Sequence, residues 1–230
     1  MLVVRIRVSF VALTLGICTL SGCVDKQPES GAKPEASNQL SAVSKEELVS
    51  VLRSKNFDKA IETFNRIKAM HYQGELLPVL SDLWYGRLDA SLDESFVKSP
   101  RIRIEIADVL VQATNNGAKT GPLAELAQFA RAMSDSTDTA VASQGILVMG
   151  EVNEQQDVAA LTRIALREER FTFEAAVASL AHSCWVDAPM IQRIEGELKS
   201  SAHRDFLEAT WKNGEAVRQG ICERFRSAKS

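Results

Sequence analysis

Apolar side chains recur every three or four residues along most of the chain after residue 43. Leu48, Val51 and Leu52 follow Ser44 at helical spacing, and Ser44 with Glu47 three residues later matches a capping box. A capping box followed by apolar positions on one face is typical of a helix start. The pattern therefore predicts that a helix begins at residue 44.

The same spacing continues in later segments, most of them bounded by helix-capping or helix-breaking residues. Ser99 before Pro100 and Asp187 before Pro189 predict helix starts, and Gly214 predicts an interruption in the last helix. No segment combines strict alternation with many β-branched residues, so a sheet is not expected. We predict an all-α domain whose further helices cover residues 58–67, 76–84, 100–113, 123–130, 141–149, 158–165, 173–181, 187–198 and 206–225.

Two sequence features favour stacked helical hairpins. Residues 56–62 resemble the turn and second-helix opening of a tetratricopeptide hairpin, and the stretch 100–199 resembles HEAT-type repeats. Ala140–Ser143 recurs as Ala176–Ser179 at an offset of 36 residues, each copy being expected to open a helix. The resemblance implies an α-solenoid-like domain over 44–226, with N-terminal hairpins at 44–97 and a HEAT-like part at 98–226. Coincidence within an alanine-rich helical domain is the alternative.

The first residues show the order of charges and apolar residues of an export signal. Arg5 and Arg7 precede an apolar run from Val8 to Thr19, and residues 1–22 contain no acidic residue. The apolar run is shorter than the about 20 residues that a membrane-spanning helix needs. We therefore predict a signal peptide over residues 1–22.

Leu20, Ser21, Gly22 and Cys23 end this leader and resemble the lipobox of bacterial lipoproteins. The resemblance implies cleavage before Cys23 and acylation of that cysteine, and several acyl chains make membrane attachment stable. It also implies the outer membrane, facing the periplasm, because Val24 rather than aspartate follows the cysteine. The alternative is an ordinary secreted protein with a chance cysteine at this position.

The segment 23–43 is polar and contains proline, glycine and serine, with almost no large apolar side chain before Leu40. Such a segment buries too little surface to offset the entropy lost on ordering. We predict a flexible tether with a fully extended reach of ~65 Å.

Composition excludes some classes of partner. After loss of residues 1–22, which carry two arginines and no acid, 25 Lys and Arg face 30 Asp and Glu, so the net charge is −5. Nucleic-acid binding requires a basic stripe, which is not visible, so no nucleic-acid partner is expected. The chain is 45% hydrophobic but only 6% aromatic, which favours helices packed through aliphatic side chains.

Two cysteines remain after Cys18 leaves with the signal and Cys23 is acylated. Cys184 and Cys222 would then lie in an oxidising compartment, which favours a disulfide between them. Two buried free cysteines acting as small apolar residues are the alternative.

The sequence shows no combination of residues that is typical of a catalytic site, so we expect neither enzymatic activity nor a cofactor or resident metal. The function that remains is a membrane-tethered adaptor that binds an envelope protein or peptide, with Trp84, Tyr85 and Trp185 as candidate contacts because aromatics dominate interface energetics. The alternative is a small-ligand or metal-handling lipoprotein, although the spacing of its ligands matches no zinc pattern. That site would use His182, Cys184, His203 and Cys222.

Overall fold

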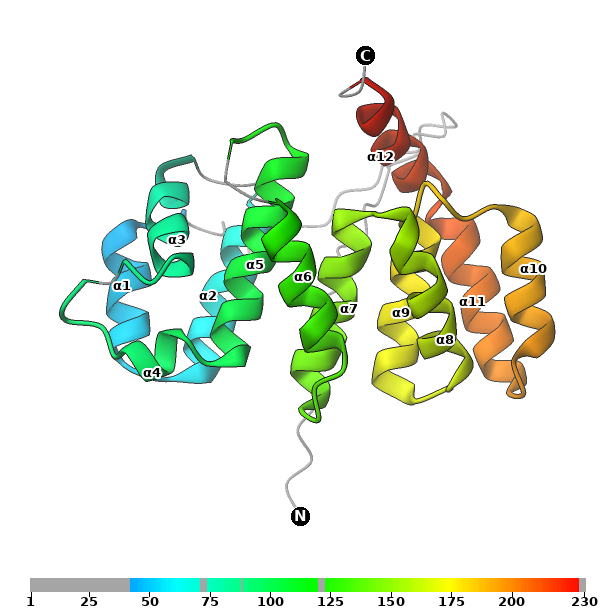
Figure 1. Cartoon of the computed structure of the whole chain (residues 1–230), viewed down its shortest axis with the longest axis horizontal. Coiled ribbons are helices and arrows are strands. Elements are labelled where there is room, and N and C mark those ends of the chain that lie inside the picture. Colours follow the sequence, from blue (N-terminus) through cyan, green and yellow to red (C-terminus); the bar gives the residue numbers. More distant parts are fainter. Residues whose placement is uncertain (1–41, 71–73, 88, 120–122, 228–230) are drawn as a thin grey trace, which may run out of the picture. The chain divides into compact units, whose positions relative to one another are not determined.

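The computed structural model describes residues 42–70, 74–87, 89–119 and 123–227, and every regular element in them is a helix. This confirms the predicted all-α class (Figure 1). The predicted signal peptide, Cys23 and most of the tether lie outside the described residues. The helices are α1 Lys45–Arg53, α2 Phe57–Ala69, α3 Leu77–Trp84, α4 Glu94–Val97, α5 Pro100–Asn115, α6 Leu123–Ser134, α7 Thr139–Val152, α8 Val158–Leu166, α9 Arg170–His182, α10 Ala188–Glu197, α11 Ser201–Asn213 and α12 Glu215–Ser227, with short 3-10 helices at Gly74–Leu76 and Gln155–Asp157.

Where several helices begin, short polar side chains accept hydrogen bonds from the first backbone N–H groups. The Glu47 backbone N–H donates to Ser44 Oγ (3.1 Å) and the Met190 N–H to Asp187 Oδ1 (2.9 Å), which confirms both predicted starts. Ser99 precedes α5 as predicted, but its hydroxyl donates to the Phe96 carbonyl (2.6 Å) instead of capping α5. The reason is α4, a short helix that the apolar spacing did not predict and that ends just before Ser99.

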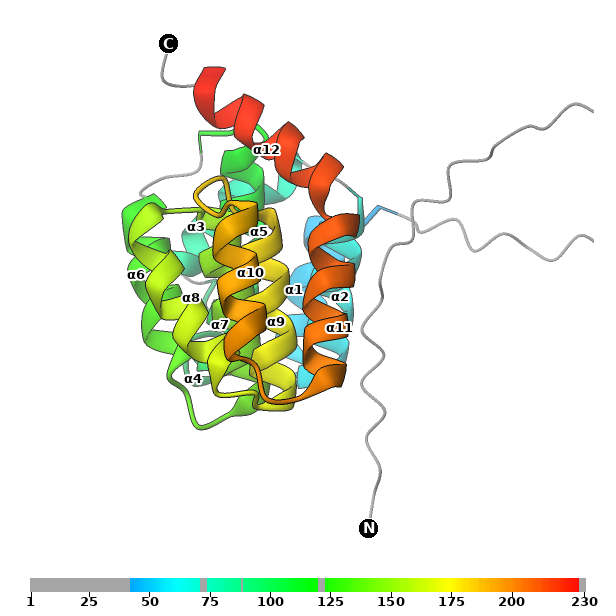
Figure 2. The same cartoon turned by 90° about the vertical axis from the view of Figure 1, so that its right-hand side faces the viewer.

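Alternate helices pack against one another in chain order. α5 contacts α7, α7 contacts α9, and α9 contacts α11, while α6 packs on α7, α8 on α9 and α10 on α11. Figure 2 shows α6 and α8 to the left of α9 and α11. At the N-terminal end, α2 and α3 both pack against α5.

One apolar core runs through the described helices, from Val43 to Leu207. In α2 the core face runs through Ala60, Phe64 and Ile67, which are all buried, whereas Ile61 is only partly buried. The packing is closest around two glycines of α7. A Cβ at Gly145 would stand 2.8 Å from the Ser134 backbone nitrogen, and one at Gly150 2.6 Å from Ser179 Cβ.

Polar side chains join helices that lie about one hairpin apart in the sequence. Gln144 donates to Asp108 (2.7 Å) and Asn115 to the Glu151 carbonyl (2.7 Å), both across 36 residues. The Arg218 guanidinium donates to the Ala181 carbonyl across 37 residues.

One detail of the predicted helices is wrong. Ala140–Ser143 does lie at the start of α7, but Ala176–Ser179 lies in the middle of α9 and opens no helix. α9 starts earlier because Arg170–Phe173 already forms helical turns, and Ser179 serves instead as a packing contact, donating to the Ile146 carbonyl (3.0 Å). The predicted interruption of the last helix at Gly214 is confirmed, because Gly214 separates α11 from α12.

Candidate functional site

The end of α3, the start of α5 and one face of α6 enclose an open hollow of about 560 Å³. Trp84 is the last residue of α3 and Tyr85 caps it, and Gly86 then turns the chain with φ +71°, a conformation that side-chain-bearing residues rarely adopt. The hollow is thus bounded by a helix end rather than by a long loop. Its main lining side chains are Trp84, Tyr85, Lys98, Arg103, Glu125 and Phe129.

Arg103 lies against two aromatic rings in this hollow. The Trp84 and Phe129 rings meet edge to face with centroids 5.3 Å apart. The Arg103 guanidinium carbon is 4.3 Å from the Trp84 centroid and 5.1 Å from that of Phe129. A planar cation held against aromatic faces is attracted by the ring quadrupoles, which fixes its position.

No carboxylate pairs with Arg103 among the described residues. Its Nε is buried without a hydrogen-bond partner, and desolvation lowers the pKa of the guanidinium below its ordinary value. The two Nη atoms have no partner in the part of the chain that the structure describes and are not among its buried unpartnered atoms, so they are accessible to solvent. Arg103 therefore presents free donors to anything that enters.

The rim of the hollow carries charges of both signs. Lys98 forms an exposed ion pair with Glu94, one helical turn earlier, and Glu125 is exposed on α6. Tyr85 is 43% exposed and Arg87 lies over its ring, 5.2 Å from the centroid. The charged lining residues are thus two cations and one carboxylate.

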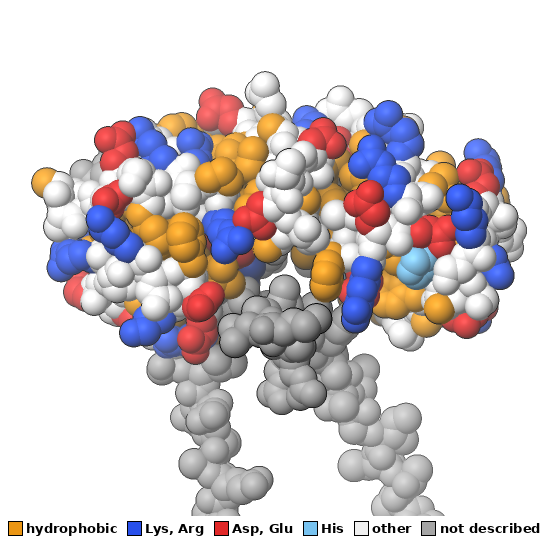
Figure 3. Space-filling view, turned by 90° about the horizontal axis from the view of Figure 1, so that it is seen from below, with side chains coloured by type: hydrophobic (Ala, Val, Ile, Leu, Met, Phe, Trp, Pro, Cys, Tyr) orange, Lys and Arg blue, Asp and Glu red, His pale blue; other side chains and the backbone are white. Residues whose placement is uncertain are grey.

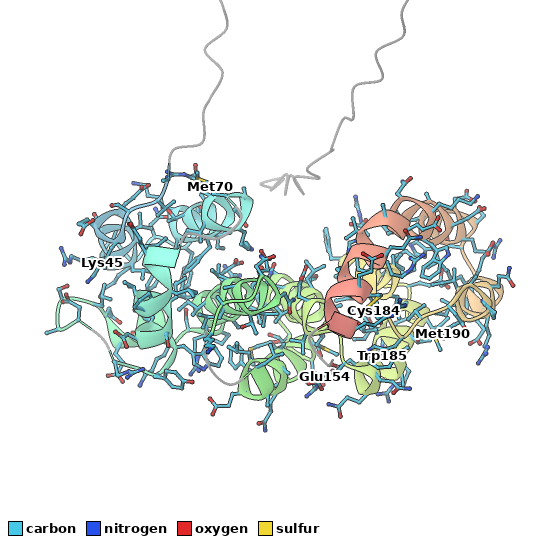
Figure 4. The ribbon with its side chains drawn as sticks, turned by 90° about the horizontal axis from the view of Figure 1, so that it is seen from above. Lys45, Met70, Glu154, Cys184, Trp185 and Met190 are labelled. Carbon is cyan, nitrogen blue, oxygen red and sulfur yellow. A yellow bond between two sulfur atoms is a disulfide. The ribbon has the colours of Figure 1, made fainter. Side chains whose placement is uncertain are left out.

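Trp84 and Tyr85, two of the three aromatics predicted for partner contact, meet in this hollow, although Trp84 is mostly core with 7% exposure. Trp185 lies elsewhere, beside Cys184 (Figure 4). Its indole N–H donates to the Asn153 carbonyl (2.8 Å), and the residue is 42% exposed. No local pattern in the sequence points to Arg103 or Phe129, because both join the hollow only through the packing of α5 on α6.

Cys184 and Cys222 form a disulfide with Cα atoms 5.3 Å apart, which confirms their predicted pairing. The bond joins the α9–α10 connection to α12. Because both sulfurs are in the disulfide, neither is a thiolate ligand for the alternative metal site. The other two residues of that site, His203 and His182, have other surroundings. His203 Nδ1 is 2.7 Å from Glu168 Oε2, and burial lowers the pKa of His182.

A buried ionic cluster joins α2 to α5. Lys68 Nζ lies 2.9 Å from Glu105 Oε2 and 2.8 Å from Asp108 Oδ2, and both acids are almost fully buried. Gln112 and Gln144 also donate to Asp108. Burial raises the pKa of Glu105, and the two acids raise the pKa of Lys68. The short distances from Lys68 to both acids make the cluster a structural contact between α2 and α5. No local pattern in the sequence predicted this cluster, because its partners lie about 40 residues apart.

The exposed surface seen in Figure 3 intersperses acidic and basic side chains, with hydrophobic ones between them. Among the described residues, no helix has both the length and the apolar content needed to cross a membrane.

Comparisons with known protein families, curated proteins and solved structures find no match.

Proposed function

We propose that this chain is a lipid-anchored protein of the bacterial cell envelope that acts as a non-enzymatic adaptor, binding a protein or peptide partner in the hollow between α3, α5 and α6. The observation that carries the proposal is Arg103, an unpaired cation held on two aromatic rings in an open concavity. Aromatics and arginine are the residues that most often dominate protein interfaces.

The openness of the hollow favours a macromolecular partner over a small ligand. Sites for small molecules enclose most of the ligand surface, whereas here Tyr85 is 43% exposed and Gln128 and Glu125 lie on an exposed flank of α6. A partner that extends beyond the hollow can cover these residues as well.

The helical domain suits such a role if it is a HEAT-like solenoid, as we also propose. The pairs α5–α6, α7–α8 and α9–α10 follow one another. Some side-chain bonds between neighbouring pairs span 36 or 37 residues, as in Gln144 to Asp108 and Arg218 to Ala181. Repeats of this length stack into binding scaffolds. The proposed anchor at Cys23 and the polar tether add confinement near a membrane, which raises the effective concentration of a partner there.

The adaptor role is tested by photo-crosslinking in intact cells. A photoreactive amino acid replaces Gln128, an exposed residue in the hollow, and in the matched control Gln192, an exposed glutamine of α10. We expect one specific protein adduct from position 128 and none of that size from position 192. The adaptor proposal is wrong if both positions give the same adducts, or if position 128 gives none.

A further inference from the structure

We propose that the hollow binds an acidic segment of the partner, with a carboxylate on Arg103 and a neighbouring apolar side chain against Trp84, Tyr85 and Phe129. This inference rests on the adaptor function and names the chemistry of its partner. It commits to a peptide segment of a protein, because the hollow combines one unpaired cation with an aromatic wall.

The carboxylate is argued from Arg103. A guanidinium presents parallel N–H donors that match the two oxygens of a carboxylate, and such bidentate pairs are the stronger kind of hydrogen bond. The stacking on Trp84 and Phe129 already holds the guanidinium, so little side-chain entropy remains to be lost on binding. The free Nη atoms supply the donors without breaking any ion pair of the protein.

The adjoining apolar side chain is argued from the wall of the hollow. Tyr85 is 43% exposed at one side, and Phe129 is a partly buried residue of α6 at the other. Covering these rings removes apolar surface from water only if the ligand brings an apolar group beside its charge. An isolated anion would leave the rings as exposed as before.

Lys98 and Glu125 act in opposite directions on such a ligand. The ammonium of Lys98 stands next to Gly86, where a Cβ would be 3.7 Å from Nζ, and its exposed pairing with Glu94 is weakly held. Lys98 can therefore turn toward a second ligand carboxylate. The exposed carboxylate of Glu125 repels an acidic ligand, so removing its charge strengthens binding.

The test uses the full-length protein in detergent and an array of synthetic peptides. Each peptide with Asp or Glu beside a Leu or Phe is paired with its Asn or Gln counterpart. We expect the acidic member of a bound pair to bind at least about tenfold more tightly, a difference within the strength of one charge-assisted contact. The bound peptides should also block the crosslink from position 128.

Three variants set the direction of the effect. Arg103→Gln should abolish the preference for acidic peptides, and Glu125→Gln should increase their affinity a few-fold. Arg193→Gln removes an exposed arginine of α10 and should change neither. Because Glu125 is exposed, its variant tests the charge effect even if loss of the Arg103 stacking harms folding.

The possible failures are distinguishable. If acidic and amide peptides bind the hollow equally, or if Glu125→Gln weakens acidic binding, the acidic-segment inference is wrong and the adaptor function stands. If the bound peptides do not block the position-128 crosslink, the inference is wrong while the crosslinked protein still supports the adaptor. If anionic vesicles or oligonucleotides block the position-128 crosslink better than the acidic peptides do, the choice of a peptide segment as the ligand is wrong.

Discussion

Asn153 holds the end of α7 in a conformation that few residues tolerate. Its φ is 57°, in the left-handed region, and the residue is 4% exposed. The side-chain Oδ1 accepts from the Ser183 hydroxyl (3.2 Å) and the Cys184 backbone N–H (3.1 Å). Asparagine thus both permits the turn and ties it to the α9–α10 connection.

Substituting Asn153 separates these two roles. Asn153→Ala loses the buried bonds and strains the backbone, so we expect about 2–4 kcal/mol of destabilisation. Asn153→Gly loses the same bonds without the strain and should cost about 1 kcal/mol less. Urea unfolding of both variants measures the difference, and equal losses would contradict a contribution from backbone strain.

Glu168 makes stability depend on acidic pH. Its carboxylate accepts from the Lys199 N–H (2.8 Å) and the Ser200 N–H (3.0 Å) and contacts His203, and these bonds lower its pKa to about 2 from an ordinary value of 4.5. A lowered folded-state pKa gives stability that is present above pH 4.5 and is lost as pH falls toward 2.

We therefore expect Glu168→Gln to flatten the pH dependence of the unfolding free energy between pH 4.5 and 2. The exposed Glu197→Gln, at the end of α10, is the control and should leave the curve unchanged in shape. Unfolding curves at a series of pH values measure both, and an unchanged slope in Glu168→Gln would contradict the role of this carboxylate.

At the scale of helices, the closest approaches depend on glycine in α7. Gly145→Ala puts a methyl group against the backbone of α6, and Gly150→Ala puts one 2.5 Å from Ser179 Oγ. Each should destabilise the fold by about 1–3 kcal/mol through overpacking. Gly196→Ala in α10 meets no atom within 4 Å and should stabilise by about 0.5–1 kcal/mol. Thermal melts of the three variants decide this, and the same sign in all three would refute the packing argument.

The disulfide stabilises the placement of α12. It closes a loop across 38 residues, for which loop-closure entropy gives up to roughly 4 kcal/mol. Reduction, or the double variant Cys184→Ser with Cys222→Ser, should lower the melting temperature by up to about 10 °C. Protein purified without reductant should show no free thiol from these two residues after denaturation, and an unaltered melting curve on reduction would contradict the prediction.

The starts of helices were predictable from the sequence where a single capping residue determines them. Ser44 and Asp187 cap the backbone N–H groups of their own helices, so their spacing was sufficient. α4 was missed because four residues are too few to show a helical period. The pairing of Cys184 with Cys222 was predictable from the number of cysteines. The position of Arg103 in the hollow was not, because it depends on which helices pack together, and the periodicity of apolar residues does not carry that information.

At the scale of the whole molecule, the proposed membrane attachment depends on Cys23. If Cys23 carries the proposed acyl chains, Cys23→Ala should abolish acylation and leave either uncleaved precursor or protein lost from the membrane, because those chains would provide the attachment. Incorporation of labelled palmitate and fractionation of the envelope measure this. Unchanged incorporation in the variant would contradict the lipoprotein assignment.

The all-α class was predictable for the part of the chain that the structure describes, because apolar spacing and composition agree in its longer helical segments. The order of packing was not, since an aliphatic stripe fits many neighbours equally well. Polar partners such as Lys68 with Asp108 or Gln144 with Asp108 select among those neighbours, and no local pattern marks them.

The bonds between helical pairs have a consequence for the speed of folding. Gln144 to Asp108, His203 to Glu168 and Arg218 to Ala181 each span 35 to 37 residues, and the disulfide spans 38. Such a topology has low contact order, because each closure brings together only nearby parts of the chain. Collapse of the helices should therefore be fast, and oxidation of Cys184 and Cys222 should be the slow final step, requiring only α9 to α12 to be in place.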